Sequence, residues 1–440
     1  MDSISIKDKP IVEMSITALR KALRLGELHP LEIYEAYMDK ISLLNPVINA
    51  YTHLSNKLET DDIRDLPLSN IPIGIKDIFD VKGYPTTAGS QFLHYNPSTN
   101  ASAVSVLTQN GAMVLGKTNT HEFAMGTTTI NPHFGTTTNP WDSKRIAGGS
   151  SGGSAAAVGA NMALVGLGSD TAGSTRIPAA FCGVIGLKPT YDQISCQGMI
   201  PLSWSLDHVG LLTRTVEDMQ HVYSVFGTKS SKSYSLTPKT LRVGIIWDSI
   251  SHLLDQVTNR AMINFVEQMQ TLNIKTASYE FPLWEETMTC GFVISRIEAA
   301  AYHHKWLEEI PNQYGEDVRI LLKTAQGLSG VEYVQAQRMR SMVIQKYEQI
   351  FESVDFLITP TVSVIAPLIT DPVDRRVLTQ FTMPFDVAGI PVVSIPVWAS
   401  GSNLPVGIQI ATKWNHELSL LKFARSIEEQ LKSQSQNFPI

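Results

Sequence analysis

Two stretches rich in glycine and serine constrain this chain more than any other feature. Residues 148–154 read GGSSGGS and residues 168–174 read GSDTAGS, which places Ser150 and Ser174 in neighbouring glycine-rich turns. Glycine loses more conformational freedom on folding than any other residue, so such stretches persist where the backbone must approach another group closely. Backbone N–H groups in such turns can also stabilise a developing negative charge. Serines at these positions therefore point to nucleophilic chemistry.

The composition is that of a soluble globular protein with a large core, because 43% of the 440 residues are hydrophobic and 17% are charged. The net charge is −6 and the basic residues are scattered, so no basic stripe indicates nucleic-acid binding. The three cysteines, Cys182, Cys196 and Cys290, form no C-x-x-C pair, which argues against a zinc site or a disulfide framework. Reduced thiols and a cytoplasmic location are expected.

No targeting or membrane segment is expected from the sequence. Residues 1–5 (MDSIS) lack the positively charged region followed by an apolar stretch that a signal peptide would have. The longest run of small apolar residues, 155–167, is too short and too rich in glycine to span a bilayer. This run is expected to form a buried helix against a sheet.

The alternation of helix and strand patterns indicates an α/β fold. Apolar runs predict strands at 71–80 and 112–117 with a helix at 103–110 between them, and this βαβ order predicts a parallel or mixed sheet covered by helices. Further strands are expected at 241–246, 356–359, 392–395 and 407–410, and helices between 15 and 44, at 216–226, through most of 255–352 and at 417–430. Residues 127–145 are expected to form an irregular loop. No repeat or low-complexity linker divides the chain, so one domain is expected over residues 1–440.

Lysine is one candidate for the base that a serine nucleophile requires. Lys76 lies in an apolar run with Ile75 and Ile78, and burial would lower the pKa of its amine from about 10.4, so that the neutral amine can accept a proton. The histidines are scattered without a G-x-S-x-G motif, which weakens a histidine-based hydrolase triad without eliminating it. Taken singly, Lys76 also fits a surface ion pair, and both serines fit turns that cap helices.

Taken together, these motifs make the chain resemble the amidase signature family. The match runs from residues 18–20 to the final helix, and its most specific segments are 72–77 (PIGIKD), 148–154, 168–183 and 186–190 (GLKPT). The resemblance implies a single α/β domain whose mixed, mostly parallel central sheet is covered by helices on both faces. In this arrangement the core signature region spans about 70–215, and the C-terminal half, about 240–440, completes the sheet and the substrate pocket.

The resemblance also implies roles in a Ser–cisSer–Lys triad. By motif position, Ser174 would be the nucleophile, Ser150 the bridging serine and Lys76 the base. The bridging serine would follow a cis peptide bond from Gly149, which the sequence itself does not reveal. The acyl-enzyme chemistry of this family needs no metal and no organic cofactor, so none is expected.

Several further residues receive expected roles from the resemblance. The backbone N–H groups of residues 171–174 would line an oxyanion hole, which assigns donors to Thr171, Ala172 and Gly173 as well as to the nucleophile. Ala172 stands where the family commonly has glycine, but backbone donation survives that change. Supporting positions around the nucleophile are expected for Ser151, Asp170 and Arg176, and substrate contacts for Met125 and Gly126.

Three functions remain open. The first is a free-standing amidase that acts on a small carboxamide, with a homodimer as a reasonable assembly. The second is the A subunit of a tRNA-dependent amidotransferase, in which the same triad releases ammonia from glutamine and a nucleic acid becomes a partner. The third is an inactive relative that serves as a scaffold or binding subunit, and the presence of all three triad residues argues against it.

Two positions favour the free-standing amidase. The amidotransferase protein is expected to carry an acidic residue just before residues 381–384 (FTMP) to hold the amino group of glutamine, but Thr379 and Gln380 stand there. The loop at 131–135 (NPHFG) also looks more like that of the general amidases. Arg340, in the long helix, is a candidate to meet a substrate carboxylate in either function, and a surface salt bridge is its alternative role.

Overall fold

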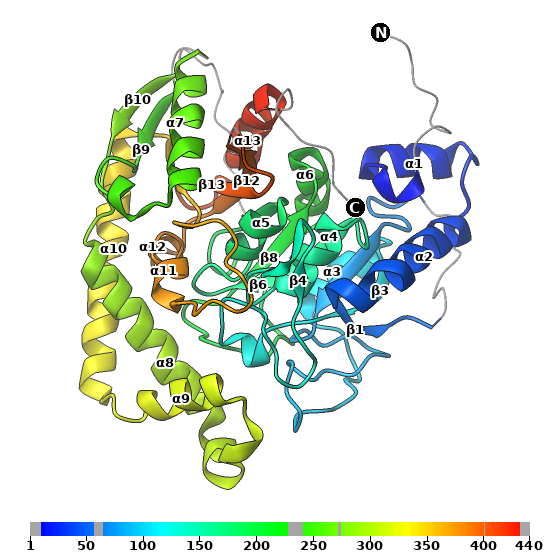
Figure 1. Cartoon of the computed structure of the whole chain (residues 1–440), viewed down its shortest axis with the longest axis horizontal. Coiled ribbons are helices and arrows are strands. Elements are labelled where there is room, and N and C mark those ends of the chain that lie inside the picture. Colours follow the sequence, from blue (N-terminus) through cyan, green and yellow to red (C-terminus); the bar gives the residue numbers. More distant parts are fainter. Residues whose placement is uncertain (1–9, 57–64, 228–240, 272–273, 400, 432–440) are drawn as a thin grey trace.

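One large sheet runs through the molecule and carries the helices on its two faces (Figure 1). The computed structural model describes residues 10–56, 65–227, 241–271, 274–399 and 401–431. Within these residues the sheet has eleven strands, in the order β1 (Tyr51–Leu54), β3 (Met113–Thr118), β2 (Pro72–Lys76), β6 (Val165–Asp170), β8 (His208–Thr213), β7 (Ile185–Lys188), β12 (Val392–Trp398), β13 (Pro405–Ala411), β11 (Phe356–Pro360), β9 (Arg242–Ile245) and β10 (Lys275–Ser278). A separate hairpin pairs β4 (Thr138–Asn139) with β5 (Asp142–Ile146).

The central sheet is mixed, as expected. Parallel pairs form where β2 meets β3 and β6, and where β9 meets β10 and β11. The strands between these flanks, including β8, β7, β12 and β13, pair antiparallel. Parallel pairing is therefore less extensive than the mostly parallel sheet that the resemblance implied. A short connection joins β12 to β13, and only antiparallel neighbours can be joined in this way.

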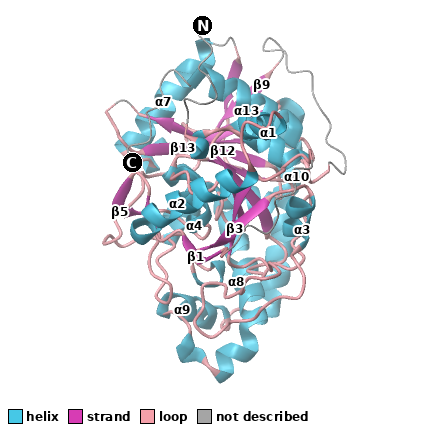
Figure 2. Ribbon diagram, turned by 90° about the vertical axis from the view of Figure 1, so that its right-hand side faces the viewer, coloured by secondary structure: helices cyan, strands magenta, loops and turns pink. Residues whose placement is uncertain are grey.

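Helices pack against both faces of this sheet (Figure 2). On one face, α4 (Gly152–Gly159) and α5 (Arg176–Cys182) pack together, and on the other α6 (Val216–Ser224) packs against α13 (Glu417–Leu431). Strands covered on both faces bury all their residues, and every residue of β2, β6 and β8 is buried. The remaining helices are α1 (Ile16–Arg24), α2 (Pro30–Ile48), α3 (Ser102–Gln109), α7 (Gln256–Thr271), α8 (Trp284–Glu309), α9 (Glu316–Ala325), α10 (Gly330–Ser353), α11 (Arg375–Thr379) and α12 (Met383–Ala388).

The long helices α8 and α10 lie side by side at one end of the molecule, with α9 at their tip (Figure 1). Both helices contact α12, which directly follows α11 along the chain. Hydrogen bonds between Asp317 of α9 and His121, and from Thr382, just before α12, to Ala172, join this end to the loops that follow β3 and β6.

Local sequence signals set the first helices as predicted. Ser15 caps α1, because its Oγ accepts a hydrogen bond from the backbone nitrogen of Ala18 at 3.2 Å. Pro30 opens α2 at its first turn, where a missing N–H costs nothing. One face of α2 is buried and includes Tyr37 and Ile41. The helical spacing of apolar residues was therefore a reliable guide in this region.

Other expected elements differ in extent. The run 155–167 is not one buried helix, because α4 ends at Gly159, Asn161 adopts a left-handed conformation (φ 57°) and β6 begins at Val165. The expected strand at 71–80 ends at Lys76, where the chain turns. The expected loop at 127–145 contains β4 and most of β5, and the mostly helical region after residue 255 contains β10. Short paired strands carry too little periodicity to stand out in a sequence.

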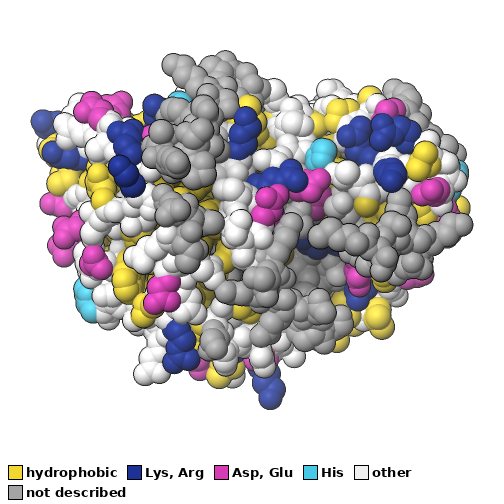
Figure 3. Space-filling model, turned by 90° about the horizontal axis from the view of Figure 1, so that it is seen from above, with side chains coloured by type: hydrophobic (Ala, Val, Ile, Leu, Met, Phe, Trp, Pro, Cys, Tyr) yellow, Lys and Arg dark blue, Asp and Glu magenta, His cyan; other side chains and the backbone are white. Residues whose placement is uncertain are grey.

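The surface carries charges of both signs. On the face seen in Figure 3, basic and acidic side chains are interspersed, and hydrophobic side chains occur between them. This distribution agrees with the scattered charges of the sequence. Among the described residues, no helix is both long enough and apolar enough to cross a bilayer.

Candidate active site

Lys76 is a fully buried amine surrounded by hydroxyl groups. It ends β2, beside the parallel strand β6, and its Nζ donates hydrogen bonds to the Oγ atoms of Ser150 (2.7 Å), Ser169 (2.8 Å) and Ser151 (3.1 Å). No carboxylate of a described residue lies within ion-pair distance of this amine. Burial lowers the pKa of Lys76 to about 7, although the charge of Asp170 opposes this shift. The expected burial and lowered pKa are thus present, but the amine itself is surrounded by hydroxyl groups.

Ser150 follows a cis peptide bond from Gly149, as the resemblance implied. Its backbone oxygen accepts hydrogen bonds from the nitrogen of His121 (3.2 Å) and the hydroxyl of Thr120 (3.0 Å). A side chain at position 149 would not fit, because an added Cβ would lie 2.7 Å from the backbone nitrogen of Thr128. Glycine is therefore required for this turn to approach the loop that follows Met125.

Ser151 joins the lysine to both glycine-rich turns. Its Oγ donates to the backbone oxygen of Ser169 and accepts from the backbone nitrogen of the same residue, both at 3.2 Å. Its own backbone nitrogen donates to the backbone oxygen of Ser174 at 3.1 Å. The expected supporting role of Ser151 thus has a structural basis in these contacts.

Ser174 lies in the loop after β6 and is 6% exposed. Its hydroxyl makes no hydrogen bond to any residue that the structure describes, and this includes Ser150. The structure therefore forms the predicted link between Lys76 and Ser150. The backbone of Ser174 contacts Ser151, which also bonds to Lys76, and the hydroxyl of Ser174 is left without a partner among the described residues.

The expected oxyanion-hole donors fall into two groups. The backbone nitrogens of Thr171, Ala172 and Ser174 donate to no other described residue. The nitrogen of Gly173, in contrast, donates to Oδ1 of Asp170 at 2.6 Å, so Gly173 holds the loop rather than offering a free N–H. Three N–H groups around this anchored residue remain available for an oxygen anion.

The backbone of this loop is held from the C-terminal half. The hydroxyl of Thr382 donates to the backbone oxygen of Ala172 at 2.6 Å. Gly173 has a φ of +118°, and an added Cβ would lie 2.3 Å from the same hydroxyl. Glycine at position 173 therefore permits both the backbone conformation and the contact with Thr382.

Asp170 and Arg176 form a fully buried ion pair beside the loop of residues 171–175. The guanidinium donates to Oδ2 of Asp170 through Nε and to Oδ1 through Nη2, both at 3.0 Å. Burial opposes ionisation of Asp170, but the charge of Arg176 overcomes it and holds the pKa of the carboxyl well below its usual range. Arg176 also donates to Asp386 (2.5 Å), Gln409 (2.9 Å) and the backbone oxygen of Thr382 (3.1 Å).

Met125 and Gly126, the predicted substrate contacts, line a cavity of about 770 Å³. Its wall also includes Thr127 and Thr128, whose backbone lies against Gly149. Neither Lys76 nor any of the serines of the two glycine-rich turns contributes to this wall. The cavity therefore borders the turn that carries Ser150 rather than containing the reacting groups.

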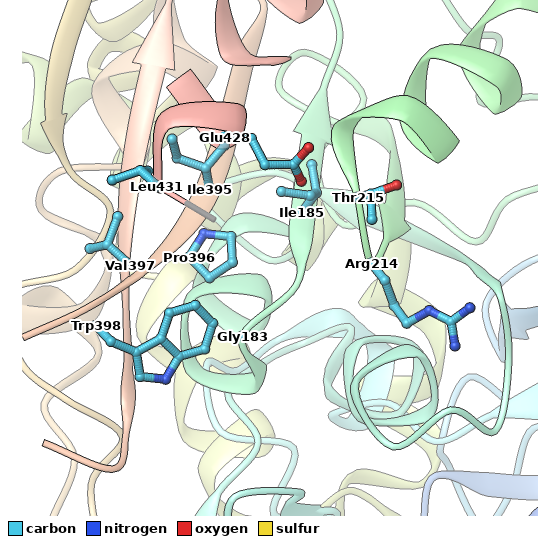
Figure 4. A pocket seen from close by; sticks show the side chains of 10 residues that line it. All are labelled: Gly183, Ile185, Arg214, Thr215, Ile395, Pro396, Val397, Trp398, Glu428 and Leu431. Carbon is cyan, nitrogen blue, oxygen red and sulfur yellow. The ribbon is translucent and has the colours of Figure 1, made fainter. Parts of the chain in front are cut away.

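A second cavity, of about 240 Å³, lies between β12 and α13 (Figure 4). It is lined mostly by apolar side chains, including Ile395, Val397 and Trp398. The guanidinium of Arg214 points away from the apolar side chains in Figure 4, and it donates to the backbone oxygens of Val12 and Met14. This cavity shares no lining residue with the first one.

Sequence reasoning missed several residues of this site. Ser169 lies within a quoted motif and bonds to Lys76, so its position beside the lysine was open to prediction. Thr382, Asp386 and Gln409 come from the C-terminal half and carry no local motif that links them to the serines.

In the described part of the chain, no three His, Cys, Asp or Glu side chains are grouped to hold a metal ion.

Comparisons with known proteins extend over nearly the whole chain. The family model named Amidase matches residues 32–421. The A subunit of the glutamyl-tRNA(Gln) amidotransferase from Prochlorococcus marinus subsp. pastoris is 34% identical over 471 aligned positions, which cover 94% of this chain and 97% of the relative. The corresponding protein of Sulfurihydrogenibium sp. is 33% identical, and the alignment covers 97% of this chain and 98% of the relative.

Solved structures give the same result. A crystal structure of an amidase superposes with a TM-score of 0.88 at 30% identity, covering 95% of this chain and all of the other. The A subunit of the glutamyl-tRNA(Gln) amidotransferase from Thermotoga maritima gives a TM-score of 0.79 at 27% identity, covering 98% of this chain and 96% of the other. A 6-aminohexanoate cyclic dimer hydrolase complexed with substrate gives 0.82 at 27%, with 96% and 97% coverage. The fold, the ordered motifs and these matches together show that the chain belongs to the amidase signature family.

Proposed function

We propose that this protein hydrolyses the C–N bond of a carboxamide, with Ser174 as the nucleophile and Lys76 as the base. The observation that carries the proposal is the hydrogen bond of 2.7 Å between a buried amine and the hydroxyl of Ser150. Burial lowers the pKa of that amine to about 7, so a large fraction of it is neutral at physiological pH. A neutral amine in this position can take up a proton relayed through Ser150.

The reaction begins when the hydroxyl of Ser174 turns toward Ser150. Ser174 Oγ attacks the amide carbon while its proton passes to Ser150, whose own proton passes to Lys76. The carbonyl oxygen becomes an anion, and the free N–H groups of Thr171 and Ala172 stabilise it. The C–N bond then breaks as the relay returns the proton to the leaving nitrogen.

The acyl-enzyme is released in a second step. Water attacks the ester carbon, gives its proton to the same relay and displaces Ser174, which regains its hydroxyl. The products are a carboxylic acid and ammonia or an amine. In this scheme Asp170 and Arg176 position the loop and do not exchange protons with the substrate.

The relatives named above favour a tRNA-dependent amidotransferase as the setting of this reaction. Three of them carry that name and align over nearly their full lengths. In this setting the protein would release ammonia from glutamine and work with partner subunits. A soluble cytoplasmic location fits this setting and remains a prediction.

The structure offers a reason to keep the free-standing amidase as the other candidate. Thr379 and Gln380 place no carboxylate before Phe381, and Thr379 is buried with its hydroxyl donating to the backbone oxygen of Arg375 at 3.0 Å. The amidase structure also superposes closely on this chain. A free-standing enzyme would act without partner subunits, with a homodimer as its predicted assembly.

One assay separates these settings and tests the chemistry. Ammonia release is measured for the purified chain over glutamine, aliphatic amides, aryl amides and ureido compounds, with and without candidate partner proteins. Activity of the chain alone on small amides supports the free-standing amidase. Activity on glutamine only with partners supports the amidotransferase.

The nucleophile is tested in the same assay. Ser174→Ala should lower turnover by about 10⁴-fold or more, because no other group can form the acyl-enzyme. Ser224→Ala serves as the matched control, since Ser224 is exposed on α6 and, among the described residues, its hydroxyl bonds only to the backbone oxygen of His221. Wild-type rates in Ser174→Ala would show that the assignment is wrong.

A further inference from the structure

The side chain of Thr171 is bonded to a buried carboxylate that takes no part in the proton relay. Its hydroxyl donates to Oδ1 of Asp207 at 2.7 Å, and both side chains are buried. Asp170 pairs with His208 where the antiparallel ladder between β6 and β8 ends. Thr171 and Asp207 are the next residues, so they also stand opposite each other. Side chains at opposite positions of antiparallel strands lie within contact distance on one face, which explains why this pair meets beside the loop of residues 171–175.

Asp207 is fixed by the turn that precedes β8. The backbone nitrogen of Ser203 donates to its two carboxylate oxygens, at 3.1 Å and 3.0 Å, and the backbone nitrogen of Leu202 donates to Oδ2 at 3.0 Å. Among the described residues, Thr171 is the only one whose side chain donates to this carboxylate. Because the acceptor is fixed by its own turn, it can determine where the donating threonine lies.

A second buried carboxylate connects this turn to the long helices. Glu298 of α8 accepts hydrogen bonds from the hydroxyl of Ser203 at 2.6 Å and from the backbone nitrogen of Ser205 at 3.0 Å. It also accepts from the hydroxyl of Tyr333, on α10, at 2.7 Å. The position of Asp207 is therefore supported by both α8 and α10.

Neither carboxylate has a cationic partner among the described residues. Asp207 and Glu298 are 4% and 0% exposed, yet no lysine, arginine or histidine forms an ion pair with them. Arg340, on the same helix as Tyr333, donates instead to the backbone oxygen of Val387 at 3.1 Å. Burying a carboxylate that only hydrogen bonds satisfy is costly. Such arrangements concentrate at functional sites, and this pair lies next to one.

The contact with Asp207 completes a set of contacts that fix the loop. The backbone of residues 172, 173 and 174 is held by the hydrogen bonds described above. Residue 171 is held through its hydroxyl. The backbone nitrogens of residues 171 and 172 keep no partner among the described residues, so these contacts position the two N–H groups without occupying them. An oxyanion hole requires donors that are in place before the negative charge develops.

We infer that Asp207 is a positioning residue for the oxyanion hole, which acts through the hydroxyl of Thr171 to align the N–H groups of Thr171 and Ala172 with the developing anion. The inference rests on the proposed amide hydrolysis and adds to it a residue outside the triad. Loss of this contact should weaken stabilisation of the transition state and leave substrate binding nearly unchanged, so it should lower kcat rather than raise KM.

The first experiment removes the hydroxyl of Thr171. Thr171→Val has nearly the same shape and should lower kcat by about tenfold or more, with KM changed by less than about threefold, because a hydrogen bond to a carboxylate is lost. Thr171→Ser keeps the hydroxyl and should hold kcat within about threefold of the wild type. Assays at about pH 8 keep most of Asp207 ionised, since burial raises the pKa of its carboxyl to about 7.

The outcomes of this experiment separate the inference from the function on which it rests. Wild-type kcat in Thr171→Val, an equal loss in Thr171→Ser, or a loss confined to KM would overturn the inference while leaving amide hydrolysis intact. Absence of amide turnover in the wild type would overturn both.

Variants of Asp207 test the other partner of the hydrogen bond. The side-chain oxygen of Asp207→Asn can still accept from Thr171, whereas Asp207→Ala removes the acceptor, so kcat should be lower in the alanine variant. In the double variant Thr171→Val/Asp207→Ala, kcat should be close to that of Asp207→Ala alone, because both changes remove the same contact. Independent losses that multiply would contradict the inference. Thr171→Val alone remains decisive should Asp207→Ala not fold.

Asp218 and Thr213 provide matched controls. Asp218 of α6 is another buried carboxylate, which accepts from the backbone nitrogen of Ile16 at 2.8 Å and from the hydroxyl of Thr215 at 2.9 Å. Thr213, at the far end of β8, is buried and donates to the backbone oxygen of Thr215 at 2.8 Å. Asp218→Ala and Thr213→Val should lower the urea midpoint and keep kcat. A fall in kcat equal to that of Asp207→Ala and Thr171→Val would show that general loss of stability slows turnover, and would overturn the inference.

Discussion

At the scale of single residues, the pH dependence of activity should follow the amine of Lys76. Its pKa is lowered by burial to about 7, so the base is neutral above this pH and protonated below it. We expect kcat/KM to fall about tenfold per pH unit below pH 7, because the protonated amine cannot accept the relayed proton. The measurement is kcat/KM between about pH 5 and 9. Lys76→Met is expected to lower kcat/KM roughly 10²–10⁴-fold and to abolish its fall on the acidic side of the pH profile.

Lys188 provides a control from the same sheet. It is also fully buried with a pKa lowered by burial to about 7, but its amine donates to the backbone oxygen of Pro189 at 3.0 Å and to neither of the two serines proposed to be catalytic. Lys188→Met should keep the acidic limb at the same pH. If the acidic limb of the pH profile shifted in Lys188→Met but persisted in Lys76→Met, the assignment of Lys76 as the base would be contradicted.

The glycine beside the proposed nucleophile leads to a second prediction at this scale. Gly173→Ala should lower kcat by about 10²-fold or more, because the new Cβ meets the hydroxyl of Thr382 and the φ of +118° does not suit alanine. Gly330→Ala is the control, since nothing lies within 4 Å of a Cβ at this first residue of α10. Steady-state kinetics with equal folded fractions by circular dichroism check both variants.

At the scale of elements, Arg176 fastens α5 to the end of β6 and to α12. Arg176→Met should lower the free energy of unfolding by about 3–5 kcal/mol, because it leaves the buried Asp170 carboxylate without its cation. The stabilising contribution of Asp170 is complete above its unfolded pKa of about 3.9 and is lost as the pH falls through its much lower folded pKa, so urea unfolding at pH 7 measures it fully.

An exposed pair supplies the contrast. Arg425 and Glu217 pair at 3.4 Å with side chains 40% and 38% exposed, so Arg425→Met should cost about 0–1 kcal/mol. Similar losses in the two arginine variants would show that burial does not decide the strength of these ion pairs.

The elements also show which parts of the candidate site can be predicted from the sequence. Residues such as Lys76 and Ser150 were predictable because they stand in motifs whose chemistry needs those residue types in that order. The partners of Arg176 were not, because Thr382, Asp386 and Gln409 lie 206, 210 and 233 positions away in the chain.

At the scale of the whole molecule, the C-terminal half should control turnover through Thr382. Thr382→Val removes the hydrogen bond of 2.6 Å to the backbone of Ala172, and we expect kcat to fall about tenfold as the oxyanion donors lose their alignment. Thr412→Val removes a partly buried hydrogen bond of 2.8 Å from another buried threonine to a backbone oxygen, that of Asp355. Both variants should lose about 1 kcal/mol of stability, but only Thr382→Val should slow catalysis. Kinetics and urea unfolding of the two proteins side by side test this.

All three proposed catalytic side chains come before residue 175. The guanidinium of Arg176, however, donates hydrogen bonds to groups that lie after residue 380 in the chain. We expect an amino-terminal fragment that contains all three side chains to be inactive. Its activity would return on complementation with the separate carboxyl-terminal fragment. For the same reason, we expect a newly synthesised chain to align these side chains only after residues beyond 380 have been made and folded.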